Sequence, residues 1–188
     1  DVSAESIETV GTGARFVLRL PAGTAPVDLR IPGEHNVSNA LAAAAACSAA
    51  GISLKDIAKG LGSFGGVERR FQVRGRAAGV TVIDDYAHHP SEIRATLSAA
   101  RSGSFGRVVA LFQPHRYTRT AALAGDFGSS FDAADRVVIT DVYGAGEEPV
   151  PGVTGKLIAD AVCESFPGRA VAYIPHRGEL LTYLSKSC

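Results

Sequence analysis

Tryptophan and methionine are absent from this sequence, and aromatic residues make up only 7% of it. Cysteine is scarce as well. Its three occurrences, Cys47, Cys163 and Cys188, are an odd number and form no CxxC pair. This usage excludes a disulfide-rich secreted scaffold and a CxxC-type zinc or redox motif. We therefore expect buried, reduced thiols and a cytoplasmic protein.

An excess of charge of either sign is also absent, since 19 Lys and Arg residues balance 19 Asp and Glu residues. The balance excludes a basic field for nucleic acid and an acidic tail, so local clusters would have to hold any anionic ligand. The longest apolar stretch, residues 40–52, contains a serine and is too short to span a bilayer. No signal peptide opens the chain. With 46% apolar residues, the composition is that of a globular protein with a real core.

A phosphate-binding GxxxxGK[ST] loop is missing from the sequence. The glycine-rich stretch 60–66 contains no lysine, and we interpret it as a hinge. The first residue is not methionine and a strand pattern follows almost at once, so we expect the sequence to begin inside a longer protein. The last expected helix ends in SKSC, where a doubly wound sheet would usually continue, so we expect a further strand beyond it.

Residues 1–71 form the first of two parts of the chain that differ in their sequence pattern. Alternating patterns predict strands at 15–20 and 27–31, separated by proline and glycine. An alanine-dense helix follows, which Asn36 or Ser38 could cap and which Gly51 ends. Ser53 and Asp56 have the spacing of a capping box for a second short helix through Leu61.

Residues 72–188 alternate between strands and helices. Apolar runs predict strands at 79–83, 107–112, 136–140 and 170–174, the first of them paired in a hairpin with 71–74. Helices are expected at 90–101, 120–131, 154–166 and 177–186. The rhythm predicts an α/β fold with a Rossmann-like, mostly parallel sheet and helices on both faces.

Polar residues gather where these four strands end, in the loops 84–90, 113–119, 141–148 and 175–177. Ligands of open parallel sheets bind beyond the carboxyl ends of the strands. The clustering therefore predicts that the functional site lies at this edge of the sheet. Taken singly, an Asp after a strand is usually a cap or turn former, and a lone histidine is usually structural. Arg116 and Arg119 could equally be a solvated helix start. Their joint occurrence at one edge weakens these alternatives.

The residue types at this edge suggest its chemistry. Asp84 or Asp85 suits ribose hydroxyls. Arg116 and Arg119 lie three apart and can bind a carboxylate or phosphate through two parallel hydrogen bonds. His88 could orient a polar substrate or transfer a proton. A metal site of His88, His89 and His115 is a weaker alternative, because adjacent histidines in extended backbone point in opposite directions.

The first part carries two further candidates. Asn36 and Asn39 lie three apart on one helix face, and their amides offer a donor and an acceptor to an adenine edge. The alternative is that one of them caps the helix. Arg69 and Arg70, beside the glycine-rich stretch, could reach phosphates or form surface ion pairs.

Five segments, in this order and spacing, resemble the Mur ligase family over almost the whole chain. They are GEHNVSNALAA, GVERRFQVRG, DDYAHHPSEIRATLSAAR, FQPHRYTRT and DVYGAGEEPVPGV. DDYAHHP and QPHRYTRT are the most specific, and they resemble the members that add L-alanine to UDP-N-acetylmuramate. The resemblance implies that residues 1–71 are the end of a central ATP-binding domain and that residues 72–188 are most of a C-terminal Rossmann-like domain.

The resemblance also implies roles for individual residues. Asn36 and Asn39 would hold adenine, Arg70 would reach the ATP phosphates, and Asp85 would hold the ribose. The residues that would form the substrate site are Tyr86, His88, His115, Arg116 and Arg119, with His88, Arg116 and Arg119 as the catalytic ones. In the family, ATP phosphorylates the muramoyl carboxylate, the amine attacks the acyl phosphate, and Mg²⁺ neutralises phosphate charge.

The family's phosphate loop, magnesium-binding acid and sugar domain are not in these 188 residues, so most Mg²⁺ ligands would lie elsewhere and this chain alone should be inactive. Two alternatives remain open. One is a sister ligase for another amino acid or peptide. The other is a non-catalytic nucleotide-binding module, which a start codon directly upstream of Asp1 would favour. The sequence does not indicate an oligomeric state.

Overall fold

The computed structural model describes residues 1–10, 13–103 and 105–187. By its internal contacts the chain forms two compact units. Unit 1 holds residues 1–86 with 102–104, and unit 2 holds 87–101 with 105–188. The expected domain boundary after residue 71 therefore falls inside unit 1, at the start of a hairpin. No helix within the described part of the chain has the length and apolar character needed to cross a membrane.

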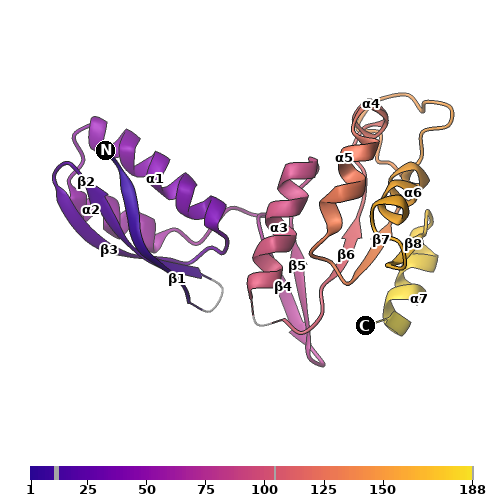
Figure 1. Ribbon diagram of the computed structural model, residues 1–188, viewed down its shortest axis with the longest axis horizontal. Helices are drawn as coiled ribbons and strands as arrows, with labels where there is room; N and C mark the ends of the chain where they lie inside the picture. Colours follow the sequence, from indigo (N-terminus) through magenta and orange to yellow (C-terminus); the bar gives the residue numbers. More distant parts are fainter. Residues whose placement is uncertain (11–12, 104, 188) are drawn as a thin grey trace. The chain divides into compact units, whose positions relative to one another are not determined.

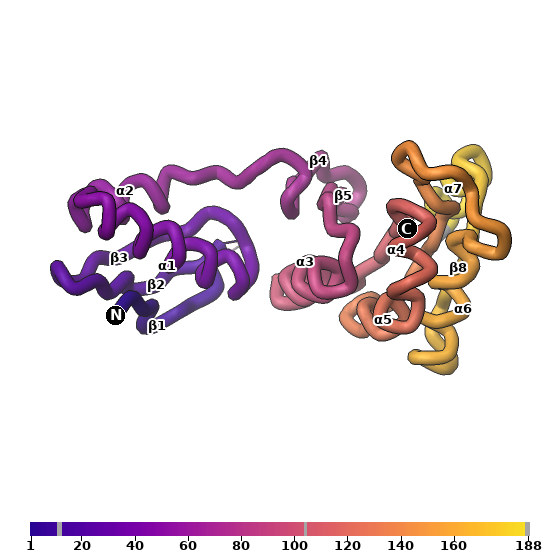
Figure 2. Tube along the Cα trace, turned by 90° about the horizontal axis from the view of Figure 1, so that it is seen from above, coloured from indigo at the N-terminus to yellow at the C-terminus, as the bar shows by residue number. Residues whose placement is uncertain are grey.

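Unit 1 begins with a three-stranded antiparallel sheet of β1 (Ser3–Val10), β2 (Gly13–Leu20) and β3 (Gly23–Leu29), in that order. Helices α1 (Glu34–Ala49) and α2 (Leu54–Ser63) cover one side of it, as Figures 1 and 2 show. Their common core contains Phe16 and Leu18 of β2 and Ala44 of α1, all at most 1% exposed. Small alanine side chains let α1 approach the sheet closely.

Two details of unit 1 differ from expectation. The α1 helix begins at Glu34 with Gly33 as its N-cap, so neither Asn36 nor Ser38 caps it. Strand β1 was not predicted, because most of its residues are exposed and the sequence therefore lacks a clear apolar alternation. The capping expectation for α2 is confirmed, since the Ser53 hydroxyl accepts a hydrogen bond from the Asp56 amide at 3.2 Å.

The expected hairpin is present as β4 (Gln72–Ala77) and β5 (Val80–Asp84), which pair antiparallel. Ala78 and Gly79, with φ of 47° and 79°, form the tight turn that such a hairpin requires. Among the described strands β5 pairs with β4 alone, so the expectation that it joins the parallel sheet is wrong. Val80 and Val82 of β5 are exposed, unlike residues of a central parallel strand.

Unit 2 contains a parallel sheet of β6 (Val109–Phe112), β7 (Arg136–Ile139) and β8 (Ala170–Tyr173), in that order. Val137, Val138 and Ile139 of the central strand have no exposed surface, as expected for a strand covered on both faces. The α/β class with a mostly parallel sheet and helices is confirmed. Its helices are α3 (Pro90–Ser102), α4 (Tyr117–Ala122), α5 (Ala124–Gly128), the short 3₁₀ turn η1 (Ser129–Phe131), α6 (Gly155–Ser165) and α7 (Arg177–Ser187).

The helices divide between the two faces of this sheet. Val138 packs with Leu180 and the rest of the α7 cluster on one face. Phe112 and Ile139, neighbours in register, lie on the other face, where Phe112 meets the rings of Phe127 and Phe131. Figure 2 shows α7 on the opposite side of the sheet from α5 and α6.

Two further expectations for unit 2 need correction. The single helix expected over 120–131 is divided into α4, α5 and η1, because Leu123 leaves the helical region with φ of −114°. Cys163, expected to be buried, is exposed, whereas Cys47 is partly buried, and both are free thiols. Cys188 lies outside the described residues.

Candidate active site

The loops that follow β6 and β7 lie side by side at the carboxyl edge of the parallel sheet. Tyr143 donates its amide to Pro114 O at 2.8 Å and accepts a bond from the Arg116 amide at 2.8 Å. His115 and Tyr143 form an isolated parallel bridge. The ladder thus continues for one more step beyond the regular strands, and it fixes where residues 115–119 leave the sheet.

Arg116 is held in an uncommon backbone conformation, with φ of 73° and ψ of 135°. Its amide is bound to Tyr143, and its carbonyl accepts hydrogen bonds from the amide and the hydroxyl of Thr120, at 3.1 and 2.8 Å. Non-glycine residues at positive φ persist when the surrounding structure fixes them, and they cluster at functional sites. The guanidinium of Arg116 remains half exposed, so it is available to a ligand.

Arg119, one helical turn beyond His115, lies against that histidine. Its Nη1 is 3.3 Å from the His115 carbonyl oxygen and 3.4 Å from the ring Nδ1. Burial of the imidazole lowers the pKa of His115 below its usual value, and the positive charge of Arg119 lowers this pKa further, with smaller contributions from His88 and Arg116. His115 is therefore neutral at neutral pH, although the permanently charged Arg116 and Arg119 lie near it.

Three rings stand in a row at this edge. The His88 and His115 centroids are 5.9 Å apart, and those of His115 and Tyr143 are 5.6 Å apart. His88 comes from the start of α3, where Glu92 accepts the amides of His88 and His89 at 2.9 and 3.1 Å. The Glu92 carboxylate also lies 3.5 Å from His88 Nδ1. A residue of the helix itself thus orients the histidine.

In unit 1, Asn36 and Asn39 meet as their spacing predicts. Asn39 Nδ2 donates to Asn36 Oδ1 at 3.3 Å, and Asn36 Nδ2 donates to Pro32 O at 2.6 Å. Asn36 is partly buried and Asn39 is exposed. The inner amide is therefore fixed by the protein, while the outer one faces solvent.

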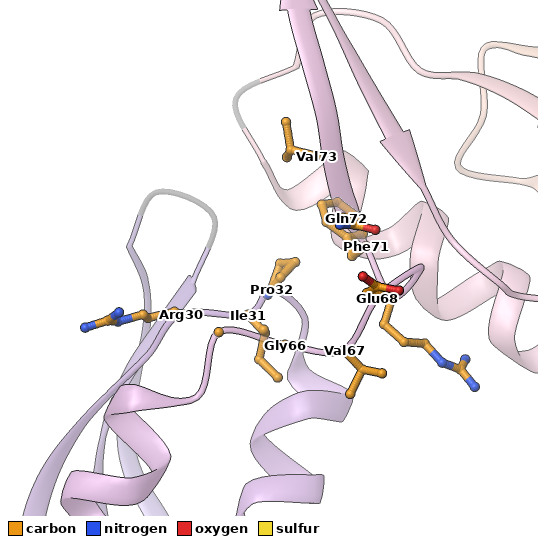
Figure 3. A pocket seen from close by; sticks show the side chains of 11 residues that line it. Arg30, Ile31, Pro32, Gly66, Val67, Glu68, Phe71, Gln72 and Val73 are labelled. Atoms are coloured by element: carbon orange, nitrogen blue, oxygen red, sulfur yellow. The ribbon is translucent and has the colours of Figure 1, made fainter.

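Unit 1 also contains a pocket of about 330 Å³ whose lining includes Pro32, the residue that accepts the Asn36 side-chain amide. Figure 3 shows Ile31 and Pro32 on one side of it, facing the segment that carries Val67, Phe71 and Gln72. The full lining is Arg30, Ile31, Pro32, Gly65, Gly66, Val67, Glu68, Arg70, Phe71, Gln72 and Val73. This mixture of apolar walls and a few polar groups, at the lower end of the usual size range, fits a small ligand or part of a nucleotide.

Arg70 lies between two residues with positive φ, Arg69 at 56° and Phe71 at 47°. Both neighbours form hydrogen bonds with the residues that directly follow β5. The Asp85 carboxylate accepts the Phe71 amide at 2.8 Å, and the Tyr86 amide donates to Arg69 O at 2.7 Å. The Arg69 guanidinium lies over the Tyr86 ring, 4.8 Å from its centroid. Asp85 thus has a structural task beside the ribose role expected of it.

The structure therefore brings the expected residues into two groups. His88, His115, Arg116 and Arg119 lie together in unit 2. Asn36, Asn39, Arg70, Asp85 and Tyr86 lie in unit 1. Across residues 1–10, 13–103 and 105–187, no three His, Cys, Asp or Glu side chains gather as a metal site would require.

Sequence reasoning gave no individual role to three residues at the unit 2 edge, although it expected the loops 84–90 and 141–148 there. Glu92 follows His88 by four residues and His89 by three, a spacing that signals a helix start and could have found it. Tyr143 and Glu147 gave no such signal, because their partners lie far away in sequence. Glu147 binds Thr118, which is 29 residues away.

The fold agrees with the comparisons to known proteins. Residues 69–188 match the family model described as "Mur ligase, glutamate ligase domain". The chain therefore belongs to the Mur ligase family.

One curated relative is the UDP-N-acetylmuramate–L-alanine ligase of Pelotomaculum thermopropionicum, 52% identical over 84% of this chain and 34% of the relative. The crystal structure of UDP-N-acetylmuramate–alanine ligase from Thermotoga maritima matches with a TM-score of 0.77 and 30% identity, over 96% of this chain and 39% of that one. MurF from Acinetobacter baumannii matches with a TM-score of 0.79 and 27% identity, over all of this chain and 38% of that one. This chain thus spans about a third of the length of the curated relative.

Proposed function

We propose that this chain is the C-terminal part of an ATP-dependent ligase that joins L-alanine to UDP-N-acetylmuramate, an early step of peptidoglycan precursor synthesis. The observation that carries the proposal is the group of Arg116 and Arg119 around a neutral His115 at the carboxyl edge of the sheet. The curated relative of P. thermopropionicum is named for this reaction.

The residues of unit 2 suit an amino acid substrate. Alanine keeps its carboxylate during ligation, and Arg116 and Arg119 supply the planar donors that bind a carboxylate with two hydrogen bonds. Its amino group must be neutral to attack an acyl carbon. A neutral His115 can accept a hydrogen bond from that amine without adding positive charge, and His88 stands beside it. Tyr86 is proposed to complete the substrate site.

The residues of unit 1 suit a nucleotide. Asn36 and Asn39 offer amide donors and acceptors to adenine, Asp85 offers a carboxylate to ribose, and Arg70 lines a pocket large enough for part of the ligand. ATP would supply the phosphoryl group that activates the muramoyl carboxylate as an acyl phosphate, with Mg²⁺ held mostly by residues outside this chain.

The proposed domain assignment keeps residues 1–71 as the end of a central ATP-binding domain and 72–188 as a C-terminal ligase domain. The family match beginning at residue 69 supports it. The proposed enzyme works in the cytoplasm, where its ATP is available.

Steady-state kinetics of the full-length protein test the proposal. Phosphate release should require ATP, UDP-N-acetylmuramate and L-alanine together. Arg119→Ala should raise the KM for alanine about tenfold or more, since a charged hydrogen bond is lost, and Arg119→Lys should restore only part of it. The exposed Arg74→Ala serves as the matched control. Phosphate release that is unchanged when alanine is omitted would refute the proposal.

A sister ligase for another amino acid is the second candidate, because the fold alone also matches MurF with a similar TM-score. Replacing alanine with other amino acids or with dipeptides in the same assay separates the two. If the protein is the alanine-adding ligase, L-alanine should give the largest kcat/KM of the compounds tested.

A further inference from the structure

The short helix α4 begins without a cap from its own N-cap residue. That residue is Arg116, and its side chain accepts no hydrogen bond from the helix. N-cap positions usually hold Ser, Thr, Asp or Asn, whose oxygen accepts the amide of the second or third helical residue. Here the second helical residue, Thr118, donates its amide to Glu147 Oε2 at 3.0 Å. A carboxylate from the loop after β7 thus takes the place of the capping side chain.

Glu147 holds the same residue a second time. The Thr118 hydroxyl donates to Glu147 Oε1 at 2.7 Å, so both carboxylate oxygens are bound. The two hydrogen bonds from Thr118 hold the pKa of Glu147 below its usual range, and the carboxylate stays ionised at neutral pH. Its charge lies 3.9 Å from Arg116 Nη1, and its side chain is only 22% exposed, against 51% for Arg116.

The loop around Glu147 is shaped to reach this helix. Ala145 and Gly146 have φ of 50° and 88°, and the Glu147 amide donates to Gly144 O at 3.0 Å, which closes a tight turn. A Cβ at Gly144 would lie 2.9 Å from Glu147 O and 3.0 Å from the Tyr117 ring. Only glycine therefore lets the turn pack against the first turn of α4.

We propose that Glu147 is a positioning residue for Arg116: by capping α4 from another loop, it frees the N-cap position to carry a substrate-binding arginine. The side chains usual at this position, such as Ser or Asp, could not give a carboxylate the two parallel, charge-assisted hydrogen bonds that an arginine gives. This inference rests on the proposed function, since Arg116 is its substrate-binding group. Glu147 does not touch the substrate in this scheme. It sets the backbone and the direction of the residue that does.

The test uses the full-length ligase with Glu147→Gln, Thr118→Val and Thr118→Ser, and with Glu148→Gln as the matched control on the exposed neighbour. Glu147→Gln should raise the KM for alanine about tenfold, the size of one lost charge-assisted hydrogen bond, while kcat and the KM for ATP change less than about twofold. Thr118→Val should give a smaller rise in the same constant. Thr118→Ser keeps the hydroxyl and should match the wild type, as should Glu148→Gln.

Two kinetic outcomes overturn the inference. One is an alanine KM for Glu147→Gln equal to that of Glu148→Gln. The other is an equal loss toward all substrates with a lowered Tm, which would mean that Glu147 only supports folding. Hydrogen exchange of the Thr118 amide separates this inference from the proposed function. If the wild type shows no alanine dependence, the proposed function fails. Thr118 exchange that is as slow in Glu147→Ala, which removes the acceptor, as in the wild type would show that Glu147 does not cap α4.

Discussion

His115 shows how a single residue acquires its chemistry from its neighbours. Neither its position after a strand nor its sequence neighbours reveal that it is desolvated. The fold places it between His88 and Tyr143 and against Arg119. Burial and the charges of Arg119, His88 and Arg116 lower the pKa of His115, while the Glu147 carboxylate opposes them, so its state at neutral pH is a product of the tertiary structure.

The pKa of His115 is the prediction at this scale. Titration followed by NMR should give a value below the ordinary one for histidine, and Arg119→Ala should raise it by removing the nearest positive charge. Because the folded-state pKa is depressed, the unfolded state binds the proton first. The contribution of this group to stability is therefore complete above about pH 6.5 and declines as the pH falls through the range between the two values. A His115 pKa at or above the unfolded value, or one that Arg119→Ala leaves unchanged, contradicts this account.

Local spacing explains which site residues the sequence revealed. Asn36 and Asn39 are three apart within α1, so the helical repeat places them on one face. Arg116 and Arg119 are also three apart, but Arg116 lies before α4 with φ of 73°, so the loop sets its direction. The role of Glu147 was not predicted, because its partner Thr118 lies 29 residues away in the sequence. Asp85 was expected at a ribose, and that role stays a prediction. Its bond to the Phe71 amide could not be foreseen without the hairpin register.

At the scale of elements, hydrophobic runs predicted most strands and helices of residues 72–188, but not which sheet each strand joins. The run at 79–83 forms the expected hairpin with β4, but it does not also join the parallel sheet. An apolar run does not specify its neighbour, whereas a two-residue turn brings adjacent strands together with little loss of entropy. The break of the 120–131 helix lies at Leu123, two residues before Gly125, and the helix-weakening effect of Gly125 and Gly128 was not weighed in the sequence prediction.

Glycine substitutions provide the prediction at this scale. A Cβ at Gly155, the first residue of α6, would lie only 1.9 Å from the carbonyl oxygen of Thr140 at the end of β7. Gly155→Ala should therefore lower the free energy of unfolding by about 3 kcal/mol, as severe overpacking does. Gly60→Ala is the matched control, because Gly60 lies within α2 and nothing stands within 4 Å of its added Cβ. It should raise stability by about 0.5–1 kcal/mol through helix propensity.

Urea unfolding of the three proteins measures both changes. Equal stabilities of Gly155→Ala and the wild type would mean that α6 does not approach β7 as closely as the structure indicates. Destabilisation by Gly60→Ala would mean that residue 60 is not in an exposed helical position.

At the scale of the whole molecule, each of the two units carries its own group of candidate site residues. Unit 1 carries the asparagine pair and the pocket beside Arg70, and unit 2 carries the arginine and histidine edge. Both groups of residues could be found from the sequence, because each lies at a helix start or a strand end. Strand β1 could not, since its exposed residues alternate only weakly.

The absence of a GxxxxGK[ST] loop from the 188 residues leads to the prediction at this scale. The isolated chain should release no phosphate from ATP in the presence of UDP-N-acetylmuramate and alanine, because it lacks the backbone cradle and lysine that hold the phosphates. A coupled phosphate assay, with the full-length protein at equal concentration as the positive control, checks this. Alanine-dependent phosphate release by the isolated chain would contradict it.

The most direct measurement for the central claim is a competition among amino acids. The full-length protein is given ATP, Mg²⁺ and UDP-N-acetylmuramate with equal concentrations of L-alanine, glycine, L-serine and D-glutamate, and the products are identified by mass spectrometry. The account predicts that the L-alanine adduct is the main product and that Arg119→Ala strongly reduces its formation. A main product containing another amino acid, or no ligated product at all, would contradict the account.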